Sequence, residues 1–312
     1  MHRPAWAHRS IRVSMHYSDQ LCAAIDETGT PACVGIDPVM DRIPAGVPGT
    51  GALARLRAFC LGTVEAVAGV VPAVKPQSAC YERYGAAGYA VLEELCALAK
   101  ELGLLVVLDV KRGDIVSTAS HYAAAAAGLG ADAVTVIGYM GRSAIEPFLE
   151  PQRDGRAMGV YVLVRTSNPD SDETQSARME SGETVAERMA SVVGELGSNR
   201  VGARGLTQVG AVVGATKSAG EVAELRERMP DAPVLVPGVG AQGGTIDQVR
   251  PLVRRGASSM GETGVLINAS RSVIFPAVKS PEHTDDPRAW KGAIHEAAKA
   301  FASECSGVWS ES

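Results

Sequence analysis

Residues 104–115 read Leu-Leu-Val-Val-Leu-Asp-Val-Lys-Arg-Gly-Asp-Ile, an apolar run that ends in charged side chains. A continuous apolar run of this kind is typical of a β-strand that is buried on both faces, as in a parallel sheet. Alternate strand residues point to the same side, so Asp109 and Lys111 are predicted to share one face, with Asp114 following the bend at Gly113. Taken alone, these charges could also form a solvated cluster of ion pairs at a strand end.

Similar short apolar runs alternate with amphipathic, alanine-rich stretches from residue 31 onward. The predicted strands span residues 32–36, 69–74, 104–115, 133–137, 159–164, 209–213, 234–236 and 264–267. The predicted helices span residues 53–68, 89–102, 118–127, 183–196, 221–229, 246–254 and 290–305. Such repeated βα units predict either a closed (β/α)₈ barrel or a large doubly wound sheet.

Polar or sharply turning residues follow the predicted strands rather than precede them. They are Asp37, Lys75, Asp109, Lys111, Ser167, Thr216, Gln242 and Arg271. Because the active site of a (β/α)₈ barrel forms at the carboxyl ends of its strands, this asymmetry favours the barrel. We therefore predict an α/β protein in which residues 19–312 form a single (β/α)₈ TIM barrel domain with a C-terminal helix. Residues 1–18 are predicted to be a flexible leader, and Met15 is an alternative start residue.

Composition and charge exclude several classes of function. The chain has a formal net charge of −5, and an acidic protein does not attract nucleic acid or an anionic membrane surface. No stretch approaches the roughly 18 apolar residues that cross a membrane. The six cysteines form no C-x-x-C pair and are expected to be reduced and buried. We therefore expect a cytoplasmic protein without nucleic-acid or membrane partners, which holds any anionic ligand through local positive charge and backbone amides.

A glycine-rich loop follows the seventh predicted strand. Residues 237–244 read Pro-Gly-Val-Gly-Ala-Gln-Gly-Gly and match G-x-G-x-x-G. A dinucleotide-binding fold places this motif after its first strand, so we discount a nicotinamide cofactor. In a barrel, the loops after the seventh and eighth strands form a phosphate cup together with a helix N-terminus. Ser270 and Arg271 follow the eighth strand and could complete this cup, although a surface salt bridge is the alternative role for Arg271.

Together these motifs resemble those of the orotidine 5′-phosphate decarboxylases, in the longer form typical of actinobacteria. The resemblance covers residues 32–276 and rests on Asp37, Lys75, Asp109-x-Lys111-x-x-Asp114-Ile115, Thr166-Ser167-Asn168-Pro169, Pro237-Gly238-x-Gly240-x-Gln242-Gly243 and Arg271. It implies a homodimer with shared active sites and no cofactor or metal. Its implied reaction is the conversion of orotidine 5′-monophosphate to uridine 5′-monophosphate and CO₂, the last step of de novo uridine monophosphate synthesis.

The resemblance also implies a role for each matched residue. Lys111 would donate a proton to C6 of the pyrimidine, Asp109 would lie beside the departing carboxylate, and Asp114 would enter from the partner subunit. Asp37, Lys75 and Thr118 would bind the ribose, and Ser167 would contact the pyrimidine. Pro237 would start the closing loop. The residues that would bind the phosphate are Gln242, Arg271, Gly240, Gly243 and Ser270. Lys75 would also be the fourth charged catalytic residue, with Asp109, Lys111 and Asp114.

The proposed chemistry accounts for these residue types. Loss of CO₂ from an sp² ring carbon leaves a carbanion without an obvious π sink, so the site must supply positive charge and then a proton. A buried ammonium can do both, and carboxylates at Asp109 and Asp114 are expected to keep Lys111 charged despite burial. Phosphate binding is expected to drive closure of residues 240–244 over the substrate.

Two other functions fit parts of the pattern. A metal-dependent sugar-phosphate decarboxylase or aldolase of the same superfamily shares the Asp-x-Lys-x-x-Asp strand, but it places a carboxylate after the second strand to hold magnesium. Lys75 occupies that place here and argues against a magnesium site. A non-catalytic nucleotide-phosphate-binding barrel would need the phosphate loops alone. For Asp37, a helix N-cap before Pro38 is the alternative to ligand binding.

Overall fold

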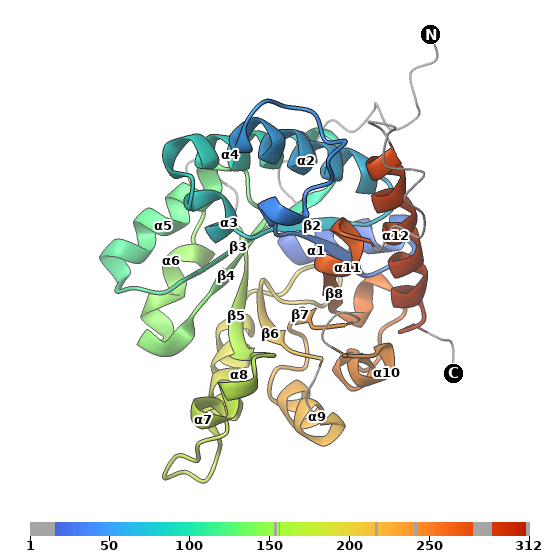
Figure 1. Ribbon diagram of the computed structural model, residues 1–312. Coiled ribbons are helices and arrows are strands. Elements are labelled where there is room, and N and C mark those ends of the chain that lie inside the picture. The colour runs from blue at the N-terminus through green and yellow to red at the C-terminus, as the bar shows by residue number, and fades with distance from the viewer. Residues whose placement is uncertain are drawn as a thin grey trace.

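The computed structural model of the protein describes residues 16–152, 155, 157–215, 218–239, 243–276 and 289–309. Its parallel strands pair in sequence order, and β8 pairs back with β1 to close a barrel (Figure 1). The strands are β1 (Ala32–Ile36), β2 (Ala73–Pro76), β3 (Leu105–Arg112), β4 (Ala133–Val136), β5 (Gly159–Arg165), β6 (Val209–Val213), β7 (Val234–Pro237) and β8 (Val265–Ala269). Closure confirms the predicted barrel and excludes the doubly wound sheet.

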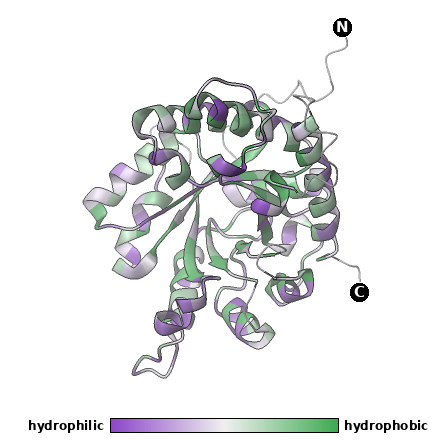
Figure 2. Cartoon of the chain, in the orientation of Figure 1, coloured by the Kyte–Doolittle hydropathy of each residue, from purple (hydrophilic) through white to green (hydrophobic). Residues whose placement is uncertain are grey.

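Helices surround the barrel, with hydrophobic colour concentrated on the strands and hydrophilic colour on the outer helix faces (Figure 2). The α-helices are α1 (Tyr17–Thr28), α2 (Ala52–Val67), α3 (Ala79–Glu82), α4 (Gly85–Glu101), α5 (Val116–Gly128), α6 (Glu146–Leu149), α7 (Asp172–Gln175), α8 (Val185–Gly197), α9 (Ala219–Arg228), α10 (Ile246–Val249), α11 (Arg271–Ile274) and α12 (Ala289–Ser306). The 3₁₀ helices are η2 (Met40–Arg42), η3 (Gly138–Met140), η4 (Arg142–Ala144), η5 (Pro169–Ser171), η6 (Arg250–Leu252) and η7 (Gly261–Thr263). Within the described segments, none of the helices combines the length and the apolar character needed to cross a membrane.

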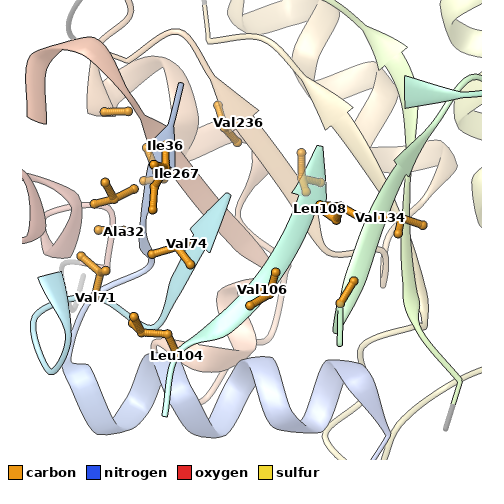
Figure 3. Close-up of a cluster of buried hydrophobic side chains, with 14 of the residues drawn as sticks. Ala32, Ile36, Val71, Val74, Leu104, Val106, Leu108, Val134, Val236 and Ile267 are labelled. Carbon is orange, nitrogen blue, oxygen red and sulfur yellow. The ribbon is translucent and has the colours of Figure 1, made fainter. Parts of the chain in front are cut away.

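The strands are apolar on both faces because each face packs into a separate core. Val106 and Leu108 of β3 belong to the outer core that the strands share with the surrounding helices. Figure 3 shows them beside Val74 of β2 and Val134 of β4. Leu105 and Val107 of the same strand point into the barrel and pack in its interior cluster. Burial on both faces explains why the strands are uninterrupted apolar runs rather than alternating patterns.

Helix α1 closes the amino-terminal end of the barrel and was not among the predicted helices. Its Tyr17, Leu21 and Ile25 pack in the interior cluster, and the Tyr17 hydroxyl lies 2.8 Å from the hydroxyl of Tyr161 on β5. The spacing of these apolar residues is that of a helix face, so the signal was present. The predicted domain boundary at residue 19 is therefore too late, because α1 begins at Tyr17, which is buried. Residues 1–15 of the predicted leader lie outside the described residues.

Strand β2 lies further along the chain than the predicted strand 69–74. Residues 68–70 form the turn after α2, with Gly69 at a φ of 75°. Pairing with β1 then joins Cys33 to Ala73 and continues to Ile36 and Pro76. Lys75 therefore lies within the strand and is buried, rather than following the strand.

Candidate active site

A cavity of about 590 Å³ opens at the carboxyl ends of the barrel strands. The predicted charged residues that line it are Asp37, Lys75, Asp109, Lys111 and Arg271. The predicted uncharged residues that line it are Ser167, Pro237 and Ser270. The fold therefore gathers side chains from strands β1, β2, β3, β5, β7 and β8 at one end of the barrel, which is where barrel enzymes place their active sites.

Asp109 is the centre of the hydrogen-bond network in this cavity. Its Oδ2 accepts from Lys75 Nζ at 2.8 Å and from Gln77 Nε2 at 3.1 Å. Its Oδ1 accepts from Lys111 Nζ at 2.5 Å and from Thr135 Oγ1 at 2.8 Å. Because both oxygens are occupied twice, the carboxylate is fixed in position and in orientation.

The two ammonium groups keep this carboxylate ionised although it is buried. Burial favours the protonated acid, but Lys75 and Lys111 outweigh burial and hold the pKa of Asp109 well below its usual range. Burial likewise favours a neutral amine at Lys75, and the charges of Asp109 and Asp37 overcome it to raise the pKa of Lys75 above its ordinary value. The pair is therefore charged throughout the neutral range.

Lys111 lies in a bulge at the end of β3 rather than in a regular strand. Leu108 pairs with Val134 and Arg112 pairs with Val136, so β3 carries extra residues between these pairs. Lys111 adopts a φ of 45°, in the left-handed region that non-glycine residues rarely enter, and its N–H donates to Thr135 Oγ1 at 3.0 Å. Asp109 and Lys111 meet as predicted, but through the bulge. Such backbone outliers concentrate at functional sites.

Two predicted site residues on the segment after β3 lie outside the cavity of their own chain. Asp114 and Thr118 are absent from the cavity lining, and Asp114 Oδ1 accepts from the N–H of Ile115 at 2.8 Å. Within the described segments, Lys111 pairs with Asp109 and not with Asp114, so the predicted lysine between two carboxylates is not formed in one chain. The predicted burial of Lys111 is likewise not found, because 43% of its side chain is exposed.

Unpartnered acceptors line the cavity on the side of β1 and β8. Among the described residues, Oδ1 of Asp37 and Oδ1 of Asn268 are buried without a hydrogen-bond partner. A buried acceptor without a donor is costly, so both atoms are suited to receive donors from a ligand. The N-cap of the helix that follows β1, η2, is Val39, so the alternative role of Asp37 as an N-cap is wrong.

The predicted phosphate side of the cavity is described in part. Pro237 ends β7, and Ser270 and Arg271 begin α11 after β8. Within the described part of the chain Arg271 forms no ion pair, so the alternative of a surface salt bridge is not supported. Gly243 is described but does not line the cavity. The predicted residues Gly240, Gln242 and Thr216 lie outside the described residues.

Several cavity residues were missed by the sequence analysis, among them the polar residues Gln77, Thr135 and Gln175. Thr135 is a polar residue in the otherwise apolar strand Ala-Val-Thr-Val, which was a usable signal. Gln77 follows Lys75 by two residues and so shares its side of the extended chain, which was a weaker signal. Gln175 lies in a long polar segment of the sequence and ends α7, and no local signal marks it as a cavity residue.

The described residues offer little support for other catalytic chemistry. In these segments no three His, Cys, Asp or Glu side chains gather closely enough to hold a metal ion. Burial raises the pKa of Cys33, Cys60 and Cys96 to about 12. Because the thiolate is the reactive form, these buried thiols are poor nucleophiles at neutral pH.

Comparison with known proteins identifies the family. Residues 19–278 match the family model described as the orotidine 5′-phosphate decarboxylase / HUMPS family. The chain belongs to this family. Among its relatives, the orotidine 5′-phosphate decarboxylase of Rhodopirellula baltica is 40% identical over 300 residues, which cover 91% of this chain and 96% of the relative. The orotidine 5′-phosphate decarboxylase of a Nocardioides species is 41% identical over 265 residues, which cover 83% and 91%.

Solved structures in the same orotidine 5′-phosphate decarboxylase / HUMPS family share the fold. The structure of Leishmania donovani OMP decarboxylase matches with a TM-score of 0.68 and 30% identity, covering 93% of this chain and 99% of that one. A crystal structure from Streptomyces avermitilis matches with a TM-score of 0.76 and 34% identity, covering 96% and 99%. The charged cavity therefore lies in a barrel whose fold the family shares over nearly its full length.

Proposed function

We propose that this protein is an orotidine 5′-phosphate decarboxylase, which converts orotidine 5′-monophosphate to uridine 5′-monophosphate and CO₂ in the last step of de novo uridine monophosphate synthesis. The observation that carries this proposal is the buried carboxylate of Asp109 held between the ammonium groups of Lys75 and Lys111 in the cavity. Relatives that are about 40% identical over most of their length bear this name.

Lys111 is proposed to stabilise and then protonate the reacting carbon. When the bond between C6 and the carboxylate breaks, its electron pair stays on C6 and CO₂ leaves. The ammonium of Lys111 places positive charge beside this carbon and then transfers a proton to it. Asp109 holds the ammonium at 2.5 Å, so little reorganisation is needed as the charge develops.

Asp109 has a second proposed role next to the departing carboxylate. Its oxygens already accept four hydrogen bonds, and its low pKa keeps it charged. A substrate carboxylate beside it would meet a like charge, which CO₂ release removes. Ground-state repulsion of this kind contributes only when remote contacts of the substrate supply the binding energy.

The remaining contacts are proposed to distribute along the nucleotide. Asp37 offers its unpartnered Oδ1 to a ribose hydroxyl, next to Lys75, and Ser167 contacts the pyrimidine. Arg271, which lines the same cavity, binds the phosphate as a bidentate donor. The other phosphate contacts proposed are Gln242, Gly240 and Gly243, in the loop that starts at Pro237, and Ser270, which follows β8.

The site is proposed to be completed by a second copy of the chain. The described residues expose large apolar side chains at Ile115, Val116, Ile137, Tyr139 and Met140, with Tyr139 87% exposed. These side chains come from the start of α5 and from residues around η3, next to Asp114 and Thr118. Burial of this apolar face in a two-fold homodimer would carry Asp114 and Thr118 of each chain to the site of its partner.

The dimer is tested by the molecular mass in solution. Light scattering is expected to give twice the chain mass of 32.4 kDa, and Tyr139→Asp is expected to shift the protein toward one chain. Val201→Asp is a matched control, because Val201 is also exposed but lies near the amino-terminal ends of the strands. A monomer in the unsubstituted protein would contradict a shared site.

The activity is tested by following the loss of orotidine 5′-monophosphate by its ultraviolet absorbance in the presence of EDTA. Full turnover is expected, because Lys75 fills the place where a magnesium-dependent relative carries a carboxylate. Turnover that requires added Mg²⁺ would indicate a metal-dependent sugar-phosphate enzyme of the same superfamily. Binding of uridine monophosphate without turnover would indicate a non-catalytic barrel. The nucleotide substrate and six unpaired cysteines fit a cytoplasmic location.

A further inference from the structure

The long segment between β5 and α8 contributes a side chain to the cavity. Figure 1 shows α7 and the loop after it extending outward beside α8. Gln175, the last residue of α7, lines the cavity together with Thr166 and Ser167, which directly follow β5. We infer that Gln175, held by Arg165, is a positioning residue for the pyrimidine end of the substrate. This inference rests on the proposed function.

Arg165 anchors α7 to the barrel. Its side chain is only 3% exposed and forms ion pairs with Asp172 of α7 and Glu221 of α9. A buried guanidinium is tolerated only when its donors are satisfied, and its Nη1 also donates to Ser171 Oγ at 3.0 Å and Gln175 Oε1 at 3.2 Å. Because Arg165 is bound to residues of both α7 and α9, these contacts hold α7 against the barrel.

An irregularity in β5 points Arg165 toward these partners. The register between β5 and β6 shifts between Leu163 and Arg165. Leu163 packs against the interior cluster of the barrel, and regular alternation would turn Arg165 to the same side. The shift instead directs Arg165 outward to α7 and α9, while leaving Thr166 and Ser167 at the cavity.

Gln175 binds both the main chain and the side chain of Thr166. Its Oε1 accepts from the Thr166 N–H at 2.9 Å, and its Nε2 donates to Thr166 Oγ1 at 2.8 Å. Thr166 Oγ1 in turn donates to Asn168 Oδ1 at 2.6 Å. The Gln175 amide therefore fixes Thr166, the residue before Ser167. The Thr166 hydroxyl fixes Asn168, the residue after Ser167.

Strand β6 holds the same turn from the other side. The N–H of Gly214 donates to the Arg165 carbonyl at 2.8 Å. A Cβ on Gly214 would lie 3.0 Å from Ser167 Cβ and 3.1 Å from its backbone nitrogen, so a larger residue here would press on Ser167 and shift it by a few tenths of an ångström. Ser167 is thus enclosed between β6 and the Gln175 contact, and its position at the pyrimidine depends on both.

The consequence is a selective effect on ligands that carry the base. Loss of Gln175 frees Thr166 and Ser167 but leaves Arg271 and Asp37 untouched, since Arg271 begins α11 and Asp37 follows β1. Binding of the pyrimidine should weaken, whereas binding of the ribose phosphate alone should not. A merely structural role for Gln175 would weaken both ligands together.

The test compares Gln175→Ala with the unsubstituted protein for two ligands, uridine 5′-monophosphate and ribose 5-phosphate. We expect the affinity for uridine monophosphate and the kcat/KM for orotidine monophosphate to fall about tenfold, as for other lost positioning hydrogen bonds. The affinity for ribose 5-phosphate should change by less than about twofold. Gln152→Ala is the matched control, because Gln152 bonds carbonyls at the other end of the barrel.

Thr166→Val keeps the inference testable if Gln175→Ala does not fold. Alone, Thr166→Val should reproduce part of the loss for uridine monophosphate and leave the affinity for ribose 5-phosphate unchanged. Where Gln175→Ala folds, the effect of Thr166→Val should be smaller in that background than in the unsubstituted protein. Equal weakening of both ligands, or no weakening of either, would overturn the inference. Failure of the proposed function is distinguishable, because it is read from turnover of the unsubstituted protein and not from the variant.

Discussion

The two ends of the barrel are built from the same strands but serve different purposes. At the amino-terminal end, α1 covers the opening, and Tyr17 meets Tyr161 in an apolar interior. At the carboxyl end, β3 and β4 continue into Asp109 and Thr135, which line an open, charged cavity. Within one strand, therefore, the first residues pack in the core and residues only a few positions later line the proposed active site. Substitutions at the two ends should have separable effects on stability and on turnover.

The largest effect is expected at Lys111, at the open end. Lys111→Ala removes the proton donor, and turnover should fall by at least about 10³-fold. Uridine monophosphate should still bind, because the ribose and phosphate contacts remain. Steady-state rates and calorimetry measure the two quantities. Lys299→Ala, at an exposed position of α12, is the control, and near-normal turnover of Lys111→Ala would contradict the mechanism.

A smaller loss is expected at Arg271, on the phosphate side of the same end. Arg271→Ala should lower kcat/KM for orotidine monophosphate by about 10- to 100-fold, the usual range for a lost charge-assisted contact. The folded fraction should not change, since Arg271 is exposed and makes no ion pair with a described residue. Arg255→Ala, with a side chain that is 89% exposed, is the control. An unchanged kcat/KM would place the phosphate elsewhere.

At the amino-terminal end, which α1 covers, substitutions are expected to lower the stability of the fold without lowering turnover. Tyr17→Ala empties part of the barrel interior and should lower the free energy of unfolding by about 3–5 kcal/mol. Tyr17→Phe removes only the hydrogen bond to Tyr161 and should cost about 1 kcal/mol. Urea denaturation measures both changes. A drop in kcat/KM of the folded Tyr17→Phe protein would show that the two ends are coupled.

The smallest effect is expected on the free energy of unfolding at acidic pH. The folded protein lowers the pKa of Asp109 below the value of about 4 that the residue has in the unfolded chain. The ionised carboxylate therefore stabilises the fold above about pH 4, and this contribution is lost as the pH falls below that value. Asp109→Asn should therefore reduce the slope of unfolding free energy against pH below about pH 4, by at most about 1.4 kcal/mol per pH unit. Asp41→Asn, which makes the same substitution at an exposed position, is the control. An unaltered slope in Asp109→Asn would contradict the lowering of the Asp109 pKa by Lys75 and Lys111.

The pattern of apolar runs predicted the barrel because parallel strands buried on both faces leave a strong local signal. β1 and β6 were predicted to the residue, and the open end was located because charged residues follow the strands. β2 was misplaced, since the apolar turn after α2 resembles a strand until its pairing with β1 is known. α1 was overlooked beside the arginine-containing leader although Tyr17, Leu21 and Ile25 have helical spacing.

The site was predictable where side chains directly follow strands and unpredictable where contacts depend on tertiary structure. Lys75, Asp109 and Lys111 converge as their strand positions required. The bulge that sets the φ of Lys111 depends on pairing with β4 and has no local signal. Gln175 reaches the cavity only because the buried Arg165 holds α7 against β5, a contact that no motif encodes.

The division of the open end between two chains is tested most directly by a hybrid dimer. Lys111→Ala and Asp114→Ala should each be nearly inactive, because each lacks one residue of every site. When the two variants are co-expressed in equal amounts, half of the dimers should be hybrids with one intact site, which restores about a quarter of normal turnover. Recovery at that level would show that Asp114 acts in the site of its partner. No recovery above the separate variants would contradict the shared site and place Asp114 in its own chain.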